Sequence, residues 1–410
     1  MTGLRGTGFG RLWAANVVSN VGDGVTLAAG PLLVASLTSD PVLISLAVFV
    51  QQVPWLLFSL ISGAYVDRLD RRRLVVVVNG LRAVVLGGLA VAVGTHHVTV
   101  PLIYAAFFLL GTAETLADNA MLTLVPALVP AAGLPAANAR LMGSQIVGNQ
   151  LLGPPVGAWL FVVAAAAPFG VDAVSFVLAG ALIASLPRTA GPPPATERTG
   201  LRTEIAEGVR WLWRHRVLRM LALSLFLMNI TFDGVLAILV LWARQRLGFG
   251  PLGYGLLLSC SAVGGVLGSV LAGRLERRLG ASILLRVGLI IETTTHLVLA
   301  LTRSAWVGCL TIGILGVHAV VWSTVTTALR QRVVPDQLRG RVNSVYYSFS
   351  AGGFAIGALQ GGFVARGFGI TAPFWFAFVV MVVFTACAWR LFSRSALDAE
   401  RHQVVLEVRA

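Results

Sequence analysis

Long apolar stretches alternate with short polar breaks along nearly the whole chain. The breaks contain proline, glycine or clusters of arginine, which end or interrupt helices. Twelve of the apolar stretches are long enough to cross a hydrocarbon core about 30 Å thick as a helix. We expect these spans at residues 11–36, 41–64, 74–95, 100–124, 141–166, 168–187, 217–242, 252–274, 281–301, 305–328, 343–365 and 369–392. The pattern therefore predicts an all-α integral membrane protein with twelve transmembrane helices.

The charge content supports a membrane location. Of the 410 residues, 57% are hydrophobic and 12% are charged, whereas a soluble globular domain carries roughly 25% charged residues. A chain this long with half that charge cannot cover its surface with polar groups, so lipid must surround most of it. The net charge of +14 does not indicate a nucleic-acid partner, because the arginines lie in short turns and form no folded basic domain.

The arginines also predict how the chain is oriented. All 31 basic residues are arginine, and 27 of them fall in or beside cytoplasmic segments if both termini are inside. Positively charged loops stay on the cytoplasmic side, so we expect a multi-pass protein of the cell (inner or plasma) membrane with both termini cytoplasmic. The first apolar stretch is too long and too polar for a cleaved signal peptide, and we expect it to remain as a helix.

The longest polar break, residues 188–216, divides the chain in two. It begins with a stiff proline-rich segment at 191–195. Apolar residues then recur at helical spacing, which indicates an amphipathic helix on the membrane surface; they are Leu201, Ile205, Val209 and Leu212. We therefore predict an N-terminal six-helix bundle at 1–187, a cytoplasmic linker at 188–216, a C-terminal six-helix bundle at 217–392 and a cytoplasmic tail at 393–410.

The two predicted bundles repeat each other in sequence. Asp23 lies 210 residues before Asp233, and Gly63 lies 210 residues before Gly273. Later the offset becomes 205 between Pro130 and Pro335, and it is 204 for the pairs Gly153–Gly357 and Gly157–Gly361. A nearly constant offset in the same order indicates two parallel repeats related by an axis along the membrane normal.

One intensely charged turn, Gly63-Ala-Tyr-Val-Asp67-Arg68-Leu-Asp70-Arg71-Arg72, separates the second and third predicted helices. Its charges must lie in water, so the apolar runs beside it are expected to cross the membrane. The turn resembles the Gly-x-x-x-Asp-Arg-x-Gly-Arg-Arg signature of the major facilitator superfamily, with Asp70 where that family usually has glycine. Positive-inside anchoring alone would also explain these arginines.

Three further segments resemble the twelve-helix drug and siderophore exporters of that superfamily, which include macrolide efflux proteins and the enterobactin exporter. They are residues 12–24, 207–214 and 330–343, of which the last, Arg-Gln-Arg-Val-Val-Pro-Asp-Gln-Leu-Arg-Gly-Arg-Val-Asn, is the most specific. The resemblance covers residues 9–392 and implies the major facilitator fold. It also implies gating of the cytoplasmic side by the charged turn and an acid of the fourth helix; the residues assigned to gating are Gly63, Asp67, Arg68, Arg71, Arg72 and Asp118.

Polar side chains inside the predicted spans need a reason, since an ionisable group there costs roughly 2.5–3.5 kcal/mol to insert. Asn20 and Asp23 share one face of the first predicted helix, and Asn229 and Asp233 echo them in the seventh. We assign these four to proton coupling or to a substrate cavity. Packing groups hydrogen-bonded to neighbouring amides are the alternative.

Glu114 lies one turn before Asp118 in the fourth predicted helix, so the two carboxylates share a face. Two carboxylates this close in a low dielectric do not both ionise readily, which suits a proton carrier. We therefore assign Glu114 to proton coupling as well. Arg82 of the third helix is a further candidate partner for Asp118.

The fifth predicted span carries Gly148, Gly153, Pro154 and Gly157. Small residues permit close helix contact, and proline bends a helix. The segment resembles the exporter motif Gly-x-x-x-Gly-Pro-x-x-Gly-Gly, although its first spacing is five rather than four. The resemblance favours export, and packing alone is the alternative.

Three more polar residues receive no transport role from the sequence. Glu292 and His296 lie one turn apart in the ninth predicted helix, and His318 lies in the tenth. We interpret them as hydrogen-bonded packing groups.

The chain carries no nucleophile-elbow, zinc-protease or phosphate-loop motif and no lysine, which excludes a Walker-type ATPase. The three cysteines form no Cys-x-x-Cys pair, so neither a metal site nor a cofactor is expected. We predict a monomeric secondary transporter, not an enzyme, that couples efflux of hydrophobic or cationic small molecules (drugs, antibiotics or siderophores) to protons by alternating access. An uptake or lipid transporter of the same fold, and a membrane sensor that moves no substrate, are the alternatives.

Overall fold

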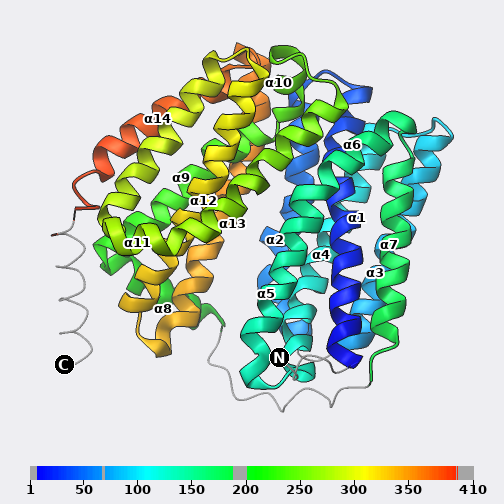
Figure 1. The fold of residues 1–410 in the computed structure, drawn as a ribbon, viewed down its shortest axis with the longest axis horizontal. Helices are drawn as coiled ribbons and strands as arrows, with labels where there is room; N and C mark the ends of the chain where they lie inside the picture. Colours follow the sequence, from blue (N-terminus) through cyan, green and yellow to red (C-terminus); the bar gives the residue numbers. More distant parts are fainter. Residues whose placement is uncertain (1–6, 67–69, 188–200, 394, 396–410) are drawn as a thin grey trace. The chain divides into compact units, whose positions relative to one another are not determined.

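The computed structural model describes residues 7–66, 70–187, 201–393 and 395, and its regular structure in those ranges is helical. The side chains of residues 7, 59–66, 118, 119, 122, 123, 201–205, 336, 337 and 339 lie outside the described part. The elements (Figure 1) are α1 (Thr7–Leu37), α2 (Pro41–Val66), α3 (Arg71–Gly94), α4 (Val100–Leu128), η1 (Ala131–Gly133), α5 (Leu134–Ser144), η2 (Gln145–Leu152), α6 (Gly153–Val163), α7 (Ala167–Ala184), α8 (Leu201–Arg214), α9 (Arg216–Leu236), α10 (Leu239–Arg246), α11 (Pro251–Leu301), α12 (Ala305–Val333), α13 (Asp336–Phe368) and α14 (Ala372–Ala388).

Every predicted span falls on helical structure, although several are divided. The span predicted at 141–166 is built from α5, η2 and α6, and α11 contains two predicted spans separated by a break at Gly280, where φ is 77°. Nine helical segments of the described residues are long and apolar enough to cross a membrane, one of them being Ala131–Val163, which joins η1, α5, η2 and α6. Gly340–Phe368 and Ala372–Ala388, bent by 119°, pass that test as a pair. The all-α membrane fold is confirmed, and the count of twelve crossings stays a prediction.

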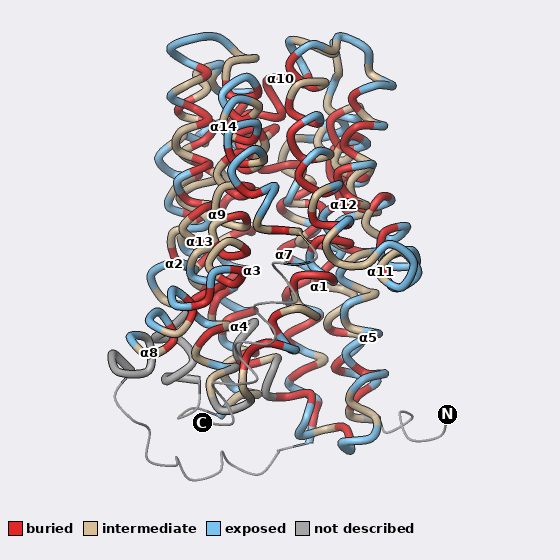
Figure 2. The backbone as a smooth tube through the Cα atoms, turned by 90° about the vertical axis from the view of Figure 1, so that its left-hand side faces the viewer, coloured by how far each residue is buried: buried red, intermediate tan, exposed pale blue. Residues whose placement is uncertain are grey.

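The chain folds into two compact units. The N-terminal unit comprises Met1–Ala195 and Ala243–Ala262, and the C-terminal unit comprises Thr196–Trp242 and Val263–Ala410. Within each unit the helices turn one face inward and expose another (Figure 2). The exposed faces carry large apolar side chains, as expected for helices that face lipid; examples are Val84, Val163, Leu310 and Phe363.

Glycines bring α1 into close contact with η2 and α6 inside the N-terminal unit. A Cβ atom at any of three glycines would come within 3.3 Å of the α1 backbone: Gly148 opposite Val21, Gly153 opposite Gly24, and Gly157 opposite Val25. Small residues are the usual means by which membrane helices approach this closely. The predicted packing role of the glycines in the fifth span therefore has a partner, and it is α1.

The five-residue spacing between Gly148 and Gly153 follows from a π-helix. The backbone N–H of Gly153 donates to the carbonyl oxygen of Gly148, an i to i+5 hydrogen bond. In such a segment residues five apart lie on the same face, so both glycines point toward α1. The π-helix ends at Leu152, and Pro154, which has no N–H to donate, is the second residue of α6.

The C-terminal unit repeats this arrangement between α9 and α13. Three glycines of α13, each of which would place a Cβ atom within 2.9 Å of the α9 backbone, line the crossing: Gly353, Gly357 and Gly361. Gly357, the counterpart of Gly153, lies against Ile230, and Gly361, the counterpart of Gly157, lies against Gly234. The repeated glycines of the sequence thus have repeated packing roles.

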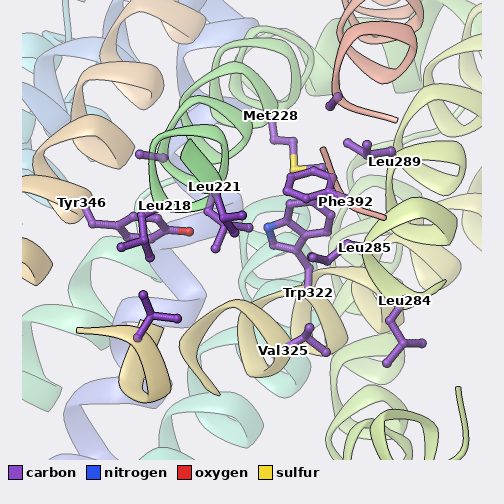
Figure 3. Close-up of a cluster of buried hydrophobic side chains, with 14 of the residues drawn as sticks. Leu218, Leu221, Met228, Leu284, Leu285, Leu289, Trp322, Val325, Tyr346 and Phe392 are labelled. Carbon is purple, nitrogen blue, oxygen red and sulfur yellow. The ribbon is translucent and has the colours of Figure 1, made fainter. Parts of the chain in front are cut away.

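An apolar cluster fills the C-terminal unit (Figure 3). Trp322 of α12 stacks edge-on against Phe392, with ring centres 6.2 Å apart, and Met228 of α9 lies beside them. Leu285 and Leu289 of α11 close the cluster from another side and are fully buried. These side chains exclude water from the middle of the unit.

The predicted amphipathic helix is present as α8, and it packs on α13. Gly208 lies against the backbone of Arg341, and the guanidinium of Arg341 pairs with the carboxylate of Glu207. Leu212 is 1% exposed and belongs to the apolar cluster of the unit. The apolar side of α8 is therefore directed into the C-terminal unit along part of its length.

Candidate functional site

A polar cavity of about 150 Å³ lies inside the N-terminal unit, between α1, α3, α4, η2 and α7. It is large enough for several water molecules, since one needs roughly 10–15 Å³ of such space. Most of its wall is polar: Asn16, Ser19, Asn20, Asp23, Asn79, Arg82, Glu114, Gln145 and Asn149. We refer to it as the N-terminal cavity. Hydrated polar pockets inside lipid-embedded helices mark the paths of ions and polar substrates.

Three of the residues assigned to coupling meet in this cavity. Asn20 and Asp23 reach it from α1 and Glu114 reaches it from α4. The amide of Asn20 donates to the Asn16 carbonyl oxygen at 2.7 Å, and Ser144 donates to the Asn16 side chain at 2.7 Å. Asp23 is half-buried near the middle of α1, whereas Glu114 is exposed at the edge of the cavity.

The sequence analysis missed Asp172 of α7, which lies behind the cavity and is 1% exposed. Its carboxylate accepts hydrogen bonds from Thr26 at 2.5 Å and from Ser175 at 3.1 Å. Gly22 of α1 makes room for it, because a Cβ there would lie 2.3 Å from the carboxylate. The signal was available, since Asp172 is the only acidic residue in the span predicted at 168–187.

Arg82 of α3 lies between this buried carboxylate and the cavity. The side chain is 7% exposed, and its guanidinium carbon stands 4.8 Å from the centre of the Phe176 ring. Asp172 is within electrostatic range of both Arg82, which attracts it, and Glu114, which repels it. The Nε atom of Arg82 has no hydrogen-bond partner in the part of the chain that is described. The proposed pairing with Asp118 concerns a side chain outside that part.

The charges of the cavity do not balance when every carboxyl group is ionised. Among the described side chains, Asp23 and Glu114 line the cavity together with the guanidinium of Arg82, and the carboxyl group of Asp172 lies behind it. Arginine stays protonated in proteins, so this set carries two excess negative charges. Uncompensated charge in a low dielectric is unfavourable, and protons or a cationic ligand can remove the excess.

The other two residues assigned to coupling belong to the C-terminal unit. Asn229 of α9 donates to the Ser350 hydroxyl at 2.7 Å and so ties α9 to α13. Asp233, one turn further along, is 7% exposed, and its Oδ2 atom has no hydrogen-bond partner among the described residues. They do not line the N-terminal cavity.

The residues assigned to gating are described only in part. Asp67, Arg68 and the side chain of Asp118 lie outside the described residues, and Gly63 lies within α2. Arg72 donates to the carbonyl oxygen of Ala184 at the C-terminal end of α7.

Cationic groups favour helix C-termini, where carbonyl groups lack partners within the helix. Arg11 of α1 donates to the next carbonyl of α7, that of Ser185, at 2.7 Å. Two arginines from different helices thus hold the end of α7.

Asp70, which departs from the superfamily signature, caps α3. Its carboxylate accepts a hydrogen bond from the backbone N–H of Arg73 at 3.2 Å, and it lies 3.6 Å from the Arg73 guanidinium. Aspartate is among the best N-cap residues. The substitution therefore supplies a helix start where the signature usually has glycine.

Comparison with known proteins identifies the family. The family described as transmembrane secretion effector matches residues 1–405. The multidrug efflux pump Tap of Mycobacterium tuberculosis is 28% identical over 388 residues, covering 88% of this chain and 87% of that pump. That relative is a transporter, which agrees with the prediction that this chain is a transporter and not an enzyme.

Solved structures share the fold. A variant of the nucleoside transporter NupG matches with a TM-score of 0.80 at 10% identity, over 94% of this chain and 100% of that one. A bacterial homologue of the iron transporter ferroportin matches with a TM-score of 0.75 at 18% identity, over 94% and 98%. The chain is a multi-pass membrane protein that belongs to the transmembrane secretion effector family of the major facilitator superfamily, whose members carry small molecules across membranes.

Proposed function

We propose that the chain exports hydrophobic or cationic small molecules in exchange for protons, by alternating access. The observation that carries this proposal is the N-terminal cavity, whose described lining includes two carboxyl groups, Asp23 and Glu114, beside one guanidinium, that of Arg82. The similarity to a multidrug efflux pump supports the outward direction. Both termini would then lie in the cytoplasm, as the arginine distribution predicts.

The three carboxylates have different duties in this proposal. Asp172 is committed to Thr26, Ser175 and Arg82, and it holds the positive charge of Arg82 in place. Asp23 and Glu114 line the cavity, so they can exchange ligands. A cationic substrate that enters from the cytoplasm displaces a proton from one of them, and protons from outside displace the substrate again.

The charged turn is proposed as the cytoplasmic gate. Arg72 is engaged with the end of α7 inside the N-terminal unit, which supports an anchoring duty for it. In this proposal the contacts that form and break at the gate are made by Asp67, Arg68, Arg71 and Asp118. Ionic contacts of this kind can bias two conformations by a few kcal/mol.

The proposal is tested in inverted membrane vesicles with ethidium, a hydrophobic cation, as the probe. Ethidium addition should release protons in wild-type vesicles, and Asp23→Asn and Glu114→Gln should each reduce that release at least tenfold. Asp40→Asn is the matched control: it also removes one carboxylate, but Asp40 accepts a hydrogen bond from the N–H of Val42 at the start of α2, a bond that asparagine can also accept.

Two results would overturn the proposal. Wild-type proton release in both cavity variants would remove these acids from the mechanism. Accumulation of ethidium in whole cells, reversed by the same substitutions, would make the chain an uptake transporter instead.

A further inference from the structure

A carboxylate between two imidazoles lies deep in the C-terminal unit. Oε1 of Glu292 stands 3.5 Å from Nε2 of His296, and Oε2 stands 3.4 Å from Nε2 of His318. The three residues are between 1% and 5% exposed. Glu292 and His296 belong to α11 and His318 to α12, so the group joins two helices.

A glycine places the second imidazole. A Cβ atom at Gly288, one turn before Glu292, would lie 2.8 Å from Cε1 of His318 and 2.8 Å from the ring of Trp322. The space left by the missing side chain allows the His318 ring to lie flat on α11 and reach the carboxylate. Trp322, which belongs to the apolar cluster of Figure 3, lies 5.7 Å from His318 between ring centres.

A fourth group completes the cluster. Asp233 of α9 lies within electrostatic range of Glu292, and the two carboxylates repel each other. Its Oδ2 atom and both ring nitrogens of His296 are buried without a hydrogen-bond partner among the described residues. Gln360 of α13 faces Gly234 and Thr385 of α14 bonds to Thr293, and neither side chain titrates. Tyr346 of α13 is a titratable group in the same apolar cluster as Trp322.

Two residues of this group, Glu292 and Asp233, stand at positions that correspond to residues of the N-terminal cavity. Glu292 lies 210 residues after Arg82, the offset that also relates Asp23 to Asp233. The helix starts agree, since α3 begins at Arg71 and the second part of α11 follows the break at Gly280. The C-terminal unit thus has a carboxylate where the N-terminal unit has a permanent cation.

We propose that Glu292, His296, His318 and Asp233 form a second proton-binding site, inside the C-terminal unit, that gains and loses protons during the transport cycle. The proposal rests on the proton exchange proposed above and adds a place where the coupling ion binds. With both imidazoles neutral and both carboxyl groups ionised, the site carries two negative charges away from water. A proton that enters either imidazole forms an ion pair with Glu292, which lies beside both rings, and two protons bring the site to neutrality.

Histidine suits this duty because its charge changes between about pH 5 and about pH 8. The alternative is a purely structural role, in which the group forms static hydrogen bonds that join α11 to α12. A metal ion is a second alternative, although no group of three His, Cys, Asp or Glu side chains among the described residues is placed to hold one. The experiment separates the three.

The full-length protein, labelled with ¹⁵N at histidine, is placed in lipid nanodiscs and titrated by NMR. His296→Gln and His318→Gln assign the two signals among the six histidines of the chain. We expect both signals to change from the neutral to the protonated form within the range from about pH 8 down to about pH 5, and we expect Glu292→Gln to abolish both changes in that range. Thr293→Val, which removes a neighbouring hydroxyl outside the cluster, should leave them intact.

Signals that stay constant in the wild type would overturn the proposal, even if Glu292→Gln does not fold. Signals that respond alike in the wild type and in folded Glu292→Gln would also overturn it. The spectra are repeated with zinc and then with a chelator, and a shift that follows the zinc would mark a metal site instead.

The test is independent of the first proposal. Asp23→Asn should leave both histidine titrations unchanged while it reduces ethidium-driven proton release. Constant histidine signals together with that reduction would defeat only the second site. Normal titrations with undiminished proton release in Asp23→Asn and Glu114→Gln would defeat only the mechanism proposed for the N-terminal cavity.

Discussion

Gly157→Ala should destabilise the N-terminal unit, because α6 has no room for a methyl group against α1. A Cβ atom at Gly157 would lie 2.1 Å from the carbonyl oxygen of Val25 and 2.8 Å from its Cα atom. Ordinary contact begins near 3.4 Å, so the helices would have to separate by about 1.3 Å at this point. Neither atom can move by a change of rotamer, since both belong to the helical backbone.

The change in the free energy of unfolding is the balance of two effects. Forcing extra volume into a packed contact costs about 1–3 kcal/mol, whereas glycine to alanine in a helix interior gains up to about 1 kcal/mol. Gly143→Ala provides the control, because Gly143 lies earlier in the same predicted span and a Cβ there meets no atom within 4 Å. The helix-propensity gain is common to both variants, so their difference isolates the clash.

The assay is thermal unfolding of the purified protein in nanodiscs, followed by tryptophan fluorescence. Gly157→Ala should unfold below the wild type and Gly143→Ala at or above it, with a difference in the free energy of unfolding of about 1–3 kcal/mol between the variants. Equal midpoints for the two variants would refute the reasoning, since they would show that α1 and α6 are not in backbone contact at Val25.

Three further outcomes follow from the same geometry. Deletion of Gln150 should be tolerated, because it converts the π-helix to an α-helix in which the two glycines are four residues apart. Deletion of Val156 should abolish folded protein, as measured by size-exclusion chromatography. Equal yields of folded protein from the two deletions would contradict this expectation. Asp70→Ala should cost about 1 kcal/mol by thermal unfolding, and Asp70→Gly only a few tenths; a large loss with glycine would rule out a simple cap. Asp172→Asn should cost about 1–3 kcal/mol, because the hydrogen bonds from Thr26 and Ser175 lose their charged acceptor and Arg82 loses one of the carboxylates that attract it. The double variant with Arg82→Leu should recover most of that loss, and a merely additive double variant would show that the two groups do not interact.

The spans could be predicted from the sequence because lipid leaves the backbone few choices. Every N–H and C=O group in the hydrocarbon core must bond within its own segment, so an apolar run becomes a helix almost regardless of its detail. The run predicted at 41–64 is the helix Pro41–Val66, and the run predicted at 305–328 begins at Ala305 as expected. The bend of 119° before Ala372 carries no comparable signal in the hydropathy.

The candidate site could be predicted only where its residues share one helix. Asn20 and Asp23 share a face of α1, and helical spacing alone places them together. Asp172 and Arg82 meet because α7 packs beside α3 and α1, which no spacing within one helix reveals. The π-helix could not be predicted either, because the sequence does not show the hydrogen-bond pattern. The five-residue spacing between Gly148 and Gly153 departs from the exporter motif, and the i to i+5 hydrogen bond explains why both glycines still pack against α1.

The fixed charge of Arg82 limits what the N-terminal cavity can exchange. A guanidinium does not release its proton in proteins, and Asp172 is held by two hydroxyl donors as well as by that guanidinium. Asp23 and Glu114 are the carboxyl groups that line the cavity among the described residues, so together they exchange at most two protons, or one proton and one monovalent cation. A measured exchange of more than two protons per substrate would require groups other than Asp23 and Glu114, and the imidazoles beside Glu292 are buried titratable groups that could supply them.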